Sequence, residues 1–259
     1  MDLTHTNRLA VVTGVGRRRS IGAGLALGLA ADGWDLVLNA WQPYDDRLGF
    51  ERTPGDPEAI AEECRALGVS VDVVLGDLSD PTFPQELLEQ ARRLGPVTAL
   101  VMSHCESVDS SILTTSVDAW DRHFAVNARA TWLLIKAFAE QLPQLTTPGA
   151  VGGRIVALTS DHTANNTPYG ASKGALDRIV IAASVELADR GVRANVVNPG
   201  PIDTGWMDDD VRAWGIADTA AGRLGTPADT ADLVRFLCSP AGSWINGQLL
   251  SSNGGFRVG

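Results

Sequence analysis

Two side chains one helical turn apart have the types and the spacing for proton transfer. Tyr169 and Lys173 lie four positions apart at the start of a predicted helix over residues 169–189. Side chains at positions i and i+4 share one face of a helix, so the Lys173 ammonium can lie near the Tyr169 hydroxyl or near a bound ribose. A phenol has an ordinary pKa of about 10, and a nearby fixed cation lowers that value. We therefore predict that Tyr169 is a general acid or base whose pKa is lowered by Lys173.

Two further polar residues are candidates for the same site. Ser160 follows a predicted strand over residues 154–159 and precedes Tyr169 by nine positions, so its hydroxyl can hydrogen-bond a substrate oxygen and orient it. Asn127 lies within a stretch of helical periodicity over residues 117–142. We expect the Asn127 amide either to cap a break in that helix or to hold a water molecule for proton relay.

A glycine-rich turn between the first predicted strand and the first predicted helix indicates a phosphate site. The turn begins at Gly14 and reaches Ser20 and Ile21 at the start of the helix. Glycine lets the backbone approach a pyrophosphate closely, and the helix N-terminus offers free N–H groups and the positive end of its dipole. This position in the chain is typical of a dinucleotide site, with a turn that only packs the helix on the sheet as the alternative.

Three consecutive arginines in that turn, Arg17, Arg18 and Arg19, bear on which dinucleotide is preferred. An arginine at this place can neutralise the 2′-phosphate of NADP(H), whereas a solvated charge cluster is the simpler explanation. The second predicted strand ends in Leu-Asn-Ala-Trp at residues 38–41, without the Asp or Glu that commonly holds the ribose hydroxyls of NAD(H). We therefore predict a preference for NADP(H), with NAD(H) as the alternative.

Two other turns follow predicted strands at the edge of the sheet where ligands bind in such folds. Asp77 follows the third strand and can accept a hydrogen bond from an adenine amine or cap the next helix. An Asn-Pro-Gly-Pro sequence makes a rigid turn after the sixth strand, and Thr204 beyond it lies within reach of a carboxamide. The candidate cofactor-binding residues from these two turns are Asp77, Leu78, Pro199, Gly200, Ile202 and Thr204.

The elements that must position these residues alternate between short β-branched runs and longer amphipathic stretches. A strand followed by a helix, repeated, predicts right-handed crossovers and a parallel sheet with helices on both faces. Two segments, residues 40–55 and 201–225, are expected to be long loops that serve as lids or binding segments. The predicted strands are 8–13, 35–39, 69–75, 97–102, 154–159, 192–198 and 247–251, and the predicted helices are 21–32, 57–67, 81–94, 117–142, 169–189 and 227–237.

Composition and charge argue against several other classes of protein. The 259 residues are 44% hydrophobic and 20% charged, and 31 acidic against 21 basic residues give a net charge of −10. The chain has no basic footprint for nucleic acid, and no stretch approaches the about 18 uninterrupted apolar residues of a membrane span. The cysteines and histidines show no metal-ligand spacing, so we expect no metal site, no disulfide framework and a cytoplasmic location.

Taken together, these motifs resemble the short-chain dehydrogenase/reductase family over nearly the whole chain. The matching features are the Thr-Gly start of the first turn, Asp77-Leu78, Asn127, Tyr169-x-x-x-Lys173, Asn198-Pro199-Gly200 and Asn253-Gly254-Gly255. The resemblance implies one domain over residues 1–259, with an α/β, three-layer, doubly wound Rossmann-type fold and a seven-stranded parallel sheet. It also implies hydride transfer between a nicotinamide and a carbonyl or hydroxyl carbon, in a homodimer or homotetramer that pairs the two long helices.

Four features depart from the family pattern. The first turn is longer than usual and has Ser20 where the middle glycine is expected, an arrangement that also resembles the enoyl-acyl-carrier-protein reductases. Ser-His-Cys at residues 103–105 replaces the usual Asn-Ala-Gly after the fourth strand. The gap between Ser160 and Tyr169 is shorter than is common, which leaves Thr159 as the alternative to Ser160. The fourth departure is the missing acid at the end of the second strand.

The sequence therefore predicts an NAD(P)-dependent oxidoreductase that acts on a ketone or a secondary alcohol, a 3-oxoacyl thioester being one candidate substrate. Two alternatives stay open: a non-catalytic dinucleotide-binding redox sensor and an enoyl thioester reductase. We expect a small-molecule substrate and neither a nucleic acid nor a membrane as partner.

Overall fold

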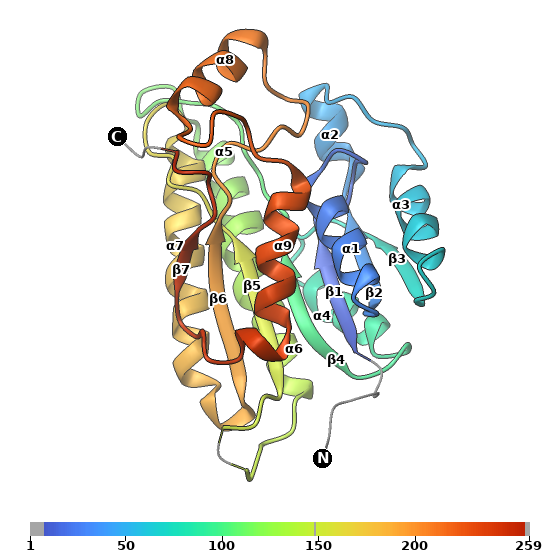
Figure 1. Ribbon diagram of the computed structural model, residues 1–259. Coiled ribbons are helices and arrows are strands. Elements are labelled where there is room, and N and C mark those ends of the chain that lie inside the picture. The colour runs from blue at the N-terminus through green and yellow to red at the C-terminus, as the bar shows by residue number, and fades with distance from the viewer. Residues whose placement is uncertain (1–7, 148, 257–259) are drawn as a thin grey trace.

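The computed structural model describes residues 8–147 and 149–256. Seven strands form one sheet in the order β3-β2-β1-β4-β5-β6-β7, and every pairing between them is parallel (Figure 1). The predicted α/β fold with a seven-stranded parallel sheet is therefore confirmed. The strands are β1 (Leu9–Thr13), β2 (Asp35–Ala40), β3 (Val71–Leu75), β4 (Val97–Met102), β5 (Gly153–Leu158), β6 (Val192–Asn198) and β7 (Leu249–Ser251).

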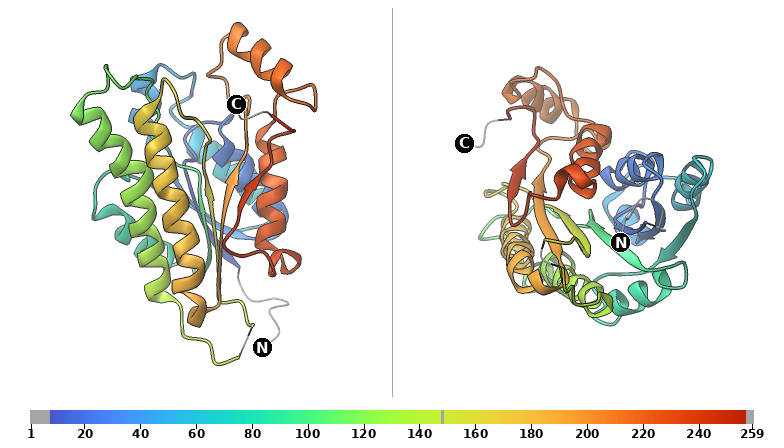
Figure 2. Two further views of the ribbon diagram at one scale, coloured as in Figure 1. Left: turned by 90° about the vertical axis from the view of Figure 1, so that its left-hand side faces the viewer. Right: turned by 60° about the horizontal axis from the view of Figure 1, so that its bottom comes forward.

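Helices cover both faces of the sheet and complete the three layers of a doubly wound fold (Figure 2). On one face lie α1 (Ile21–Ala31), α3 (Asp56–Arg65) and α9 (Pro227–Cys238). On the other face lie α4 (Phe83–Ala91), α6 (Ala130–Gln141) and α7 (Thr167–Glu186). Among the described residues, no helix combines the length and the apolar character needed to cross a bilayer.

The position of β1 between two layers of helices explains why its sequence is almost entirely apolar. Every residue of β1 is buried. Leu9 and Val11 belong to the core beneath α4, α6 and α7, whereas Ala10 and Val12 belong to the core beneath α1, α3 and α9. Alternate side chains of a strand point to opposite faces, so a strand between two helical layers must be apolar throughout.

The strand order reverses between β1 and β4, and this switch point is where such folds bind ligands. The turns after these two strands touch. Gly14 has a φ of +79°, and a Cβ at that position would lie 2.7 Å from the backbone of Ser103 and His104. Only glycine fits there, because it tolerates both the left-handed conformation and the close approach of the second turn.

The two segments predicted as long loops both contain a short helix. Residues 40–55 include α2 (Gln42–Leu48), which ends at Gly49 in the left-handed conformation, with a φ of +67°. Residues 201–225 include α8 (Asp209–Asp218), whose N-cap Asp208 accepts a hydrogen bond from the Val211 N–H. Both helices are short and largely exposed, so the apolar periodicity by which a helix is predicted is weak in their sequences.

The predicted helix over residues 117–142 is interrupted. It consists of α5 (Val117–His123), a π-helical turn η1 (Phe124–Arg129) and α6. Asn127 lies in this π-helical turn, so the expected break in the helix is present at the predicted residue. The helix predicted over 169–189 begins two residues earlier, as α7, and is followed by the 3-10 turn η2 (Ala188–Arg190); a second 3-10 turn, η3 (Pro240–Gly242), follows α9.

Candidate active site

A cavity of about 170 Å³ lies at the switch point, between the turns that follow β1, β2, β3 and β4. The structure brings together at its walls these predicted cofactor-binding residues: Gly14, Arg17, Ser20, Ile21, Asp77, Leu78 and Thr204. In the described residues no group of side chains could hold a metal ion. The site is therefore a groove lined by a glycine-rich turn, by two arginines, Arg17 and Arg122, and by the carboxylates of Asp45, Asp77 and Glu106.

The phosphate turn is held by its own side chains and by close packing. Ser20 is the N-cap of α1, and its hydroxyl oxygen accepts a hydrogen bond from the Ala23 N–H at 3.1 Å. A Cβ on Gly22 would lie 2.4 Å from the Gly14 carbonyl oxygen, so the helix packs directly on the turn. Ser20 thus supplies a cap that the glycine usual at this position cannot.

The three arginines of the turn have different surroundings, and the expectation that all three face the dinucleotide is not met. Arg17 lines the cavity. Arg18 pairs with Glu63 of α3, and Arg19 pairs with Asp203 at 3.1 Å. The side chains of Arg18 and Arg19 are more than half exposed because these acids hold them outside the cavity.

Pro199, Gly200 and Ile202 do not line the cavity but shape the turn after β6. Gly200 has a φ of +67°, and a Cβ there would lie 2.4 Å from the Cβ of Asn253. Ile202 is buried and forms an isolated parallel bridge with Gly225. This turn brings Thr204 to the cavity, where its carbonyl accepts a hydrogen bond from Arg17 Nη1 at 2.9 Å.

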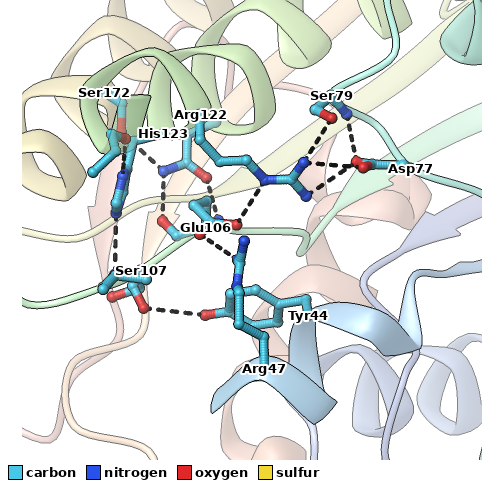
Figure 3. Close-up of polar contacts among 12 residues, drawn as sticks. Tyr44, Arg47, Asp77, Ser79, Glu106, Ser107, Arg122, His123 and Ser172 are labelled. Carbon is cyan, nitrogen blue, oxygen red and sulfur yellow. Dashed lines mark hydrogen bonds and ion pairs between the residues drawn. The ribbon is translucent and has the colours of Figure 1, made fainter. Parts of the chain in front are cut away.

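Asp77 belongs to an ionic network on the β3 side of the cavity (Figure 3). Arg122 of α5 donates to Asp77 at 3.1 Å and to the carboxylate of Glu106 at 3.4 Å. Glu106 also pairs with Arg47 of α2, and its side chain is only 3% exposed. A buried carboxylate needs such partners, because burial otherwise penalises its charge. Asp77 also accepts a hydrogen bond from the Ser79 N–H, which makes it a local cap as well.

Asn127 is fully engaged with its neighbours. Its amide oxygen accepts the Glu106 N–H at 2.8 Å, and its NH₂ group donates to the Glu106 carbonyl at 2.9 Å and to the Ser172 hydroxyl at 2.8 Å. The side chain therefore fastens the π-helical turn both to the segment after β4 and to α7. Of the two roles expected for Asn127, the structure shows the one at the helix break.

His104 links the same elements from the other side. Its Nδ1 lies 2.7 Å from the Thr13 hydroxyl at the end of β1, and its Nε2 lies 3.1 Å from the Val126 carbonyl in the π-helical turn. Burial lowers the pKa of His104 to about 3, so the ring is neutral. A neutral imidazole that donates from Nε2 and accepts at Nδ1 satisfies both partners.

Tyr169 and Lys173 share one face of α7, as predicted. The Lys173 ammonium lies 5.8 Å from the centroid of the Tyr169 ring and donates to the Leu158 carbonyl at 2.8 Å. The Ser160 side chain lies near Tyr169 and partly opposes the rise in the pKa of the phenol, and its Oγ accepts a hydrogen bond from the His162 N–H at 3.2 Å. The hydroxyl of the alternative, Thr159, is buried and makes no hydrogen bond within the described residues. Ser160, and not Thr159, therefore lies beside the phenol.

The prediction that Lys173 gives Tyr169 a low pKa is wrong for this structure. Burial raises the pKa of Tyr169 above its ordinary value of 10, and the neighbouring thiol of Cys105 raises it further. Burial likewise lowers the pKa of Lys173, because a cation also loses its hydration there. The phenol is therefore protonated at neutral pH.

Comparison with known proteins decides the family. The family model described as "Enoyl-(Acyl carrier protein) reductase" matches residues 14–257. The uncharacterized oxidoreductase YjdA of Bacillus subtilis is 31% identical, with 99% of this chain and 100% of that protein covered. This chain is a member of the short-chain dehydrogenase/reductase family. Its relatives are named as oxidoreductases and reductases, so this family member is an NAD(P)-dependent enzyme, and the alternative of a non-catalytic sensor is not supported.

Two further similarities concern the cofactor. An NADPH-dependent aldehyde reductase-like protein of Arabidopsis thaliana is 34% identical to this short-chain dehydrogenase/reductase, with 98% of this chain and 96% of that protein covered. The crystal structure of a blue fluorescent protein from a metagenomic library, in complex with NADPH, superposes with a TM-score of 0.84 at 31% identity. The superposition covers 97% of this chain and 98% of the blue fluorescent protein chain.

The groove of this short-chain dehydrogenase/reductase fits a nicotinamide dinucleotide by its own features. Gly14 and Gly22 keep the phosphate turn free of side chains that would fill it, and Arg17 supplies a cation at its wall. Cys105 also lines the groove and lies close enough to influence the pKa of both Tyr169 and Lys173. The predicted catalytic residues Asn127, Ser160, Tyr169 and Lys173 do not themselves line this cavity, and Cys105 is the residue of its wall that lies near Tyr169 and Lys173.

Some residues of the site were not found by sequence reasoning: Tyr44, Asp45, Glu106 and Arg122. Tyr44 and Asp45 lie on α2 inside a segment that was expected to bind, so its length was the available signal. Glu106 and Arg122 come from the segment after β4 and from α5, and their partners are distant in sequence. No local pattern in the sequence distinguishes them from surface charges.

Proposed function

We propose that this enzyme reduces a ketone with NADPH, or oxidises the corresponding secondary alcohol with NADP⁺, with Tyr169 as the proton-transferring residue. The observation that carries the proposal is the Tyr169 phenol, which lies one helical turn from the buried Lys173 and near both Ser160 and Cys105, the latter a residue of the cavity wall. The nicotinamide supplies or accepts the hydride when it is bound.

The protonation state of Tyr169 favours the reductive direction. Its hydroxyl is protonated at neutral pH, as that of an ordinary phenol is, and a protonated phenol is the acid that a carbonyl oxygen needs as it gains negative charge. Ser160 orients that oxygen by a second hydrogen bond. Lys173 has two N–H donors besides the one used by the Leu158 carbonyl, and these hold the ribose. Asn127 positions the π-helical turn behind the site.

The preference for NADP(H) rests on Arg17 and on the end of β2. Arg17 can pair with a 2′-phosphate. Asn39 near the end of β2 is uncharged and would not repel that phosphate, and its amide donates to the carbonyls of Val74 and Gly76. The Arabidopsis relative is named as NADPH-dependent, and the blue fluorescent protein binds NADPH, which supports the same preference here.

Replacement of Tyr169 by phenylalanine tests this function. We expect NADPH-dependent turnover of a panel of ketones to fall by about 100-fold or more, since a positioned proton donor contributes that much to rate. Binding of NADPH, followed by its fluorescence, should stay near the wild-type affinity because the phenol is not needed to seat the dinucleotide. Unchanged turnover in Tyr169→Phe would overturn the proposal.

Reduction of an enoyl thioester is the second candidate, because the matching family model carries that description and Ser20 stands in the phosphate turn. A 3-oxoacyl thioester and a conjugated enoyl thioester of the same chain length separate the two activities. Oxidation of NADPH by the first thioester alone supports carbonyl reduction, and oxidation by the second alone supports enoyl reduction.

We infer further that copies of the chain associate through α6 and α7. These helices lie side by side on one face of the molecule (Figure 2), and apolar side chains stand on their outer surfaces. Trp132 on α6 is 51% exposed and Val185 on α7 is 73% exposed. Such side chains gain from burial against a second copy.

A further inference from the structure

An acidic side chain of α2 occupies the anion-binding position beside the phosphate turn. Asp45 Oδ1 accepts a hydrogen bond from Arg17 Nε at 2.9 Å, and both side chains are nearly buried. The second carboxylate oxygen, Oδ2, lies against Gly16, where an added Cβ would be 2.7 Å away. The carboxylate thus lies against the turn itself, at the one arginine of the three that lines the groove.

Two further contacts hold the Arg17 side chain in its orientation toward Asp45. Its Nη1 donates to the Thr204 carbonyl at 2.9 Å, and its guanidinium carbon lies 4.6 Å from the centre of the Phe50 ring. The planar guanidinium cannot turn to a second anion without losing these contacts. A phosphate that approaches the turn therefore meets an arginine that is already neutralised by Asp45.

Contacts across the groove keep α2 in place. The Tyr44 hydroxyl donates to the Ser107 carbonyl at 3.4 Å, and Arg47 pairs with Glu106 (Figure 3). Since α2 follows β2 and Glu106 follows β4, these contacts join the two sides of the groove. The cavity left between them has a volume of about 170 Å³, below the about 300–1,000 Å³ of typical ligand pockets.

The two nicotinamide dinucleotides differ at this point of contact. The 2′-phosphate of NADP(H) brings negative charge to Arg17, and NAD(H) has a hydroxyl there. Like charges in contact repel, so a phosphate and the Asp45 carboxylate cannot share one guanidinium without cost. We propose that Asp45 is a specificity-determining residue, which competes with the 2′-phosphate for Arg17 and weakens the binding of NADP(H) relative to NAD(H). This inference rests on the proposed function, since it takes the groove to be the dinucleotide site.

The burial of the Asp45 carboxylate supports its competition with a phosphate for Arg17. The pKa of Asp45 is raised because burial penalises its charge, while Arg17 opposes that effect. The carboxylate is therefore held in the groove chiefly by the cation that the phosphate also needs. Once a phosphate pairs with Arg17, Asp45 loses the cation to which it is hydrogen-bonded, and Arg52 is the other cation that acts on its charge.

The test measures the affinity of NADPH and of NADH, by their fluorescence, in Asp45→Asn. Asparagine keeps the size of the side chain and an oxygen for Arg17 but removes the charge. We expect the affinity for NADPH to rise on the order of tenfold, while the affinity for NADH changes much less. A thermal melt establishes that the variant is folded, and Asp45→Ser provides a second variant if it is not.

Two controls separate charge competition from simple opening of the groove. Arg47→Gln releases α2 from Glu106 but leaves the pair between Arg17 and Asp45, so it should change both affinities by the same factor. In an Arg17→Gln background, Asp45→Asn should no longer alter the ratio of the two affinities, because the arginine for which the anions compete is gone.

The outcomes are distinct. An unchanged ratio in Asp45→Asn, or an effect that persists without Arg17, overturns the assignment of Asp45 and leaves the proposed function intact. If wild-type protein binds neither dinucleotide, the proposed function fails, and this inference fails with it.

Discussion

At the scale of single residues, burial decides the chemistry of this site more than sequence spacing does. Tyr169 and Lys173 have the expected spacing, yet burial moves both pKa values in the direction that disfavours charge. The phenol is therefore a proton donor before any ligand binds. The same effect acts on Asp45, whose charge is retained by Arg17.

His104 gives a pH dependence that can be measured without substrate. Its pKa falls from 6.5 to about 3 on folding, so below pH 6.5 the unfolded chain binds a proton here that the folded chain does not. The stabilisation is complete above pH 6.5 and is lost as pH falls toward 3, at up to about 1.4 kcal/mol per pH unit. Urea titrations between pH 7 and pH 4 should give His104→Asn a shallower decline in the free energy of unfolding than wild type. Equal slopes would show that His104 is not held neutral.

At the scale of elements, two short helical segments supply several residues of the site. Neither segment is distinguished in the sequence by the apolar periodicity from which helices are predicted. The π-helical turn η1 carries Asn127, and α2 carries Asp45 to the phosphate turn. The switch point then brings these elements together with the turns after β1 and β4.

The N-terminus of α9 provides a test of local stability, because α9 packs on α1 beside the phosphate turn. Thr226 and Asp229 form a capping box, in which each side chain accepts a hydrogen bond from the other residue's N–H. Thr226→Ala removes the cap and should lower the free energy of unfolding by about 1 kcal/mol in urea titrations. Thr146→Ala, an exposed threonine outside the helices, should change it by much less. Equal effects would mean that the cap is not formed.

At the scale of the whole molecule, the layers place the cavity at one edge of the sheet and leave exposed apolar side chains on the outer surface of α6 and α7, where we propose that copies associate. Trp132 lies on that surface and belongs to neither side of the groove. The net charge of −10 works against association, so the contact must be mainly apolar.

Light scattering tests this assembly. Wild-type protein should have the mass of a dimer or a tetramer, and Trp132→Glu should shift the population toward smaller species, because it places an additional negative charge in the contact. Leu67→Glu is the control, since Leu67 is also 51% exposed but lies just after α3, on the opposite face of the sheet. A monomeric wild type, or an unchanged mass in Trp132→Glu, contradicts association through α6 and α7.

The parallel sheet, the phosphate turn and the pair formed by Tyr169 and Lys173 were predictable, because each depends on local patterns: alternating elements, glycines between strand and helix, and a spacing of four on a helix. The order of the strands came from the structure. The helix α2 was not predictable as a helix, because a short exposed segment has no strong apolar period. The different surroundings of Arg17, Arg18 and Arg19 were not predictable either, because their acidic partners come from other parts of the chain.

The sequence by itself determined which chemistry is available: a phenol with an amine one turn away, a turn that admits phosphate, and a parallel sheet to hold them. The tertiary structure alone decided the pKa shifts and the pairings, namely that burial raises the pKa of Tyr169, that His104 is neutral and that Asp45 faces Arg17. The physical reason is that pKa values and ion pairs depend on burial and on neighbours within a few ångströms, and these neighbours are distant in the chain.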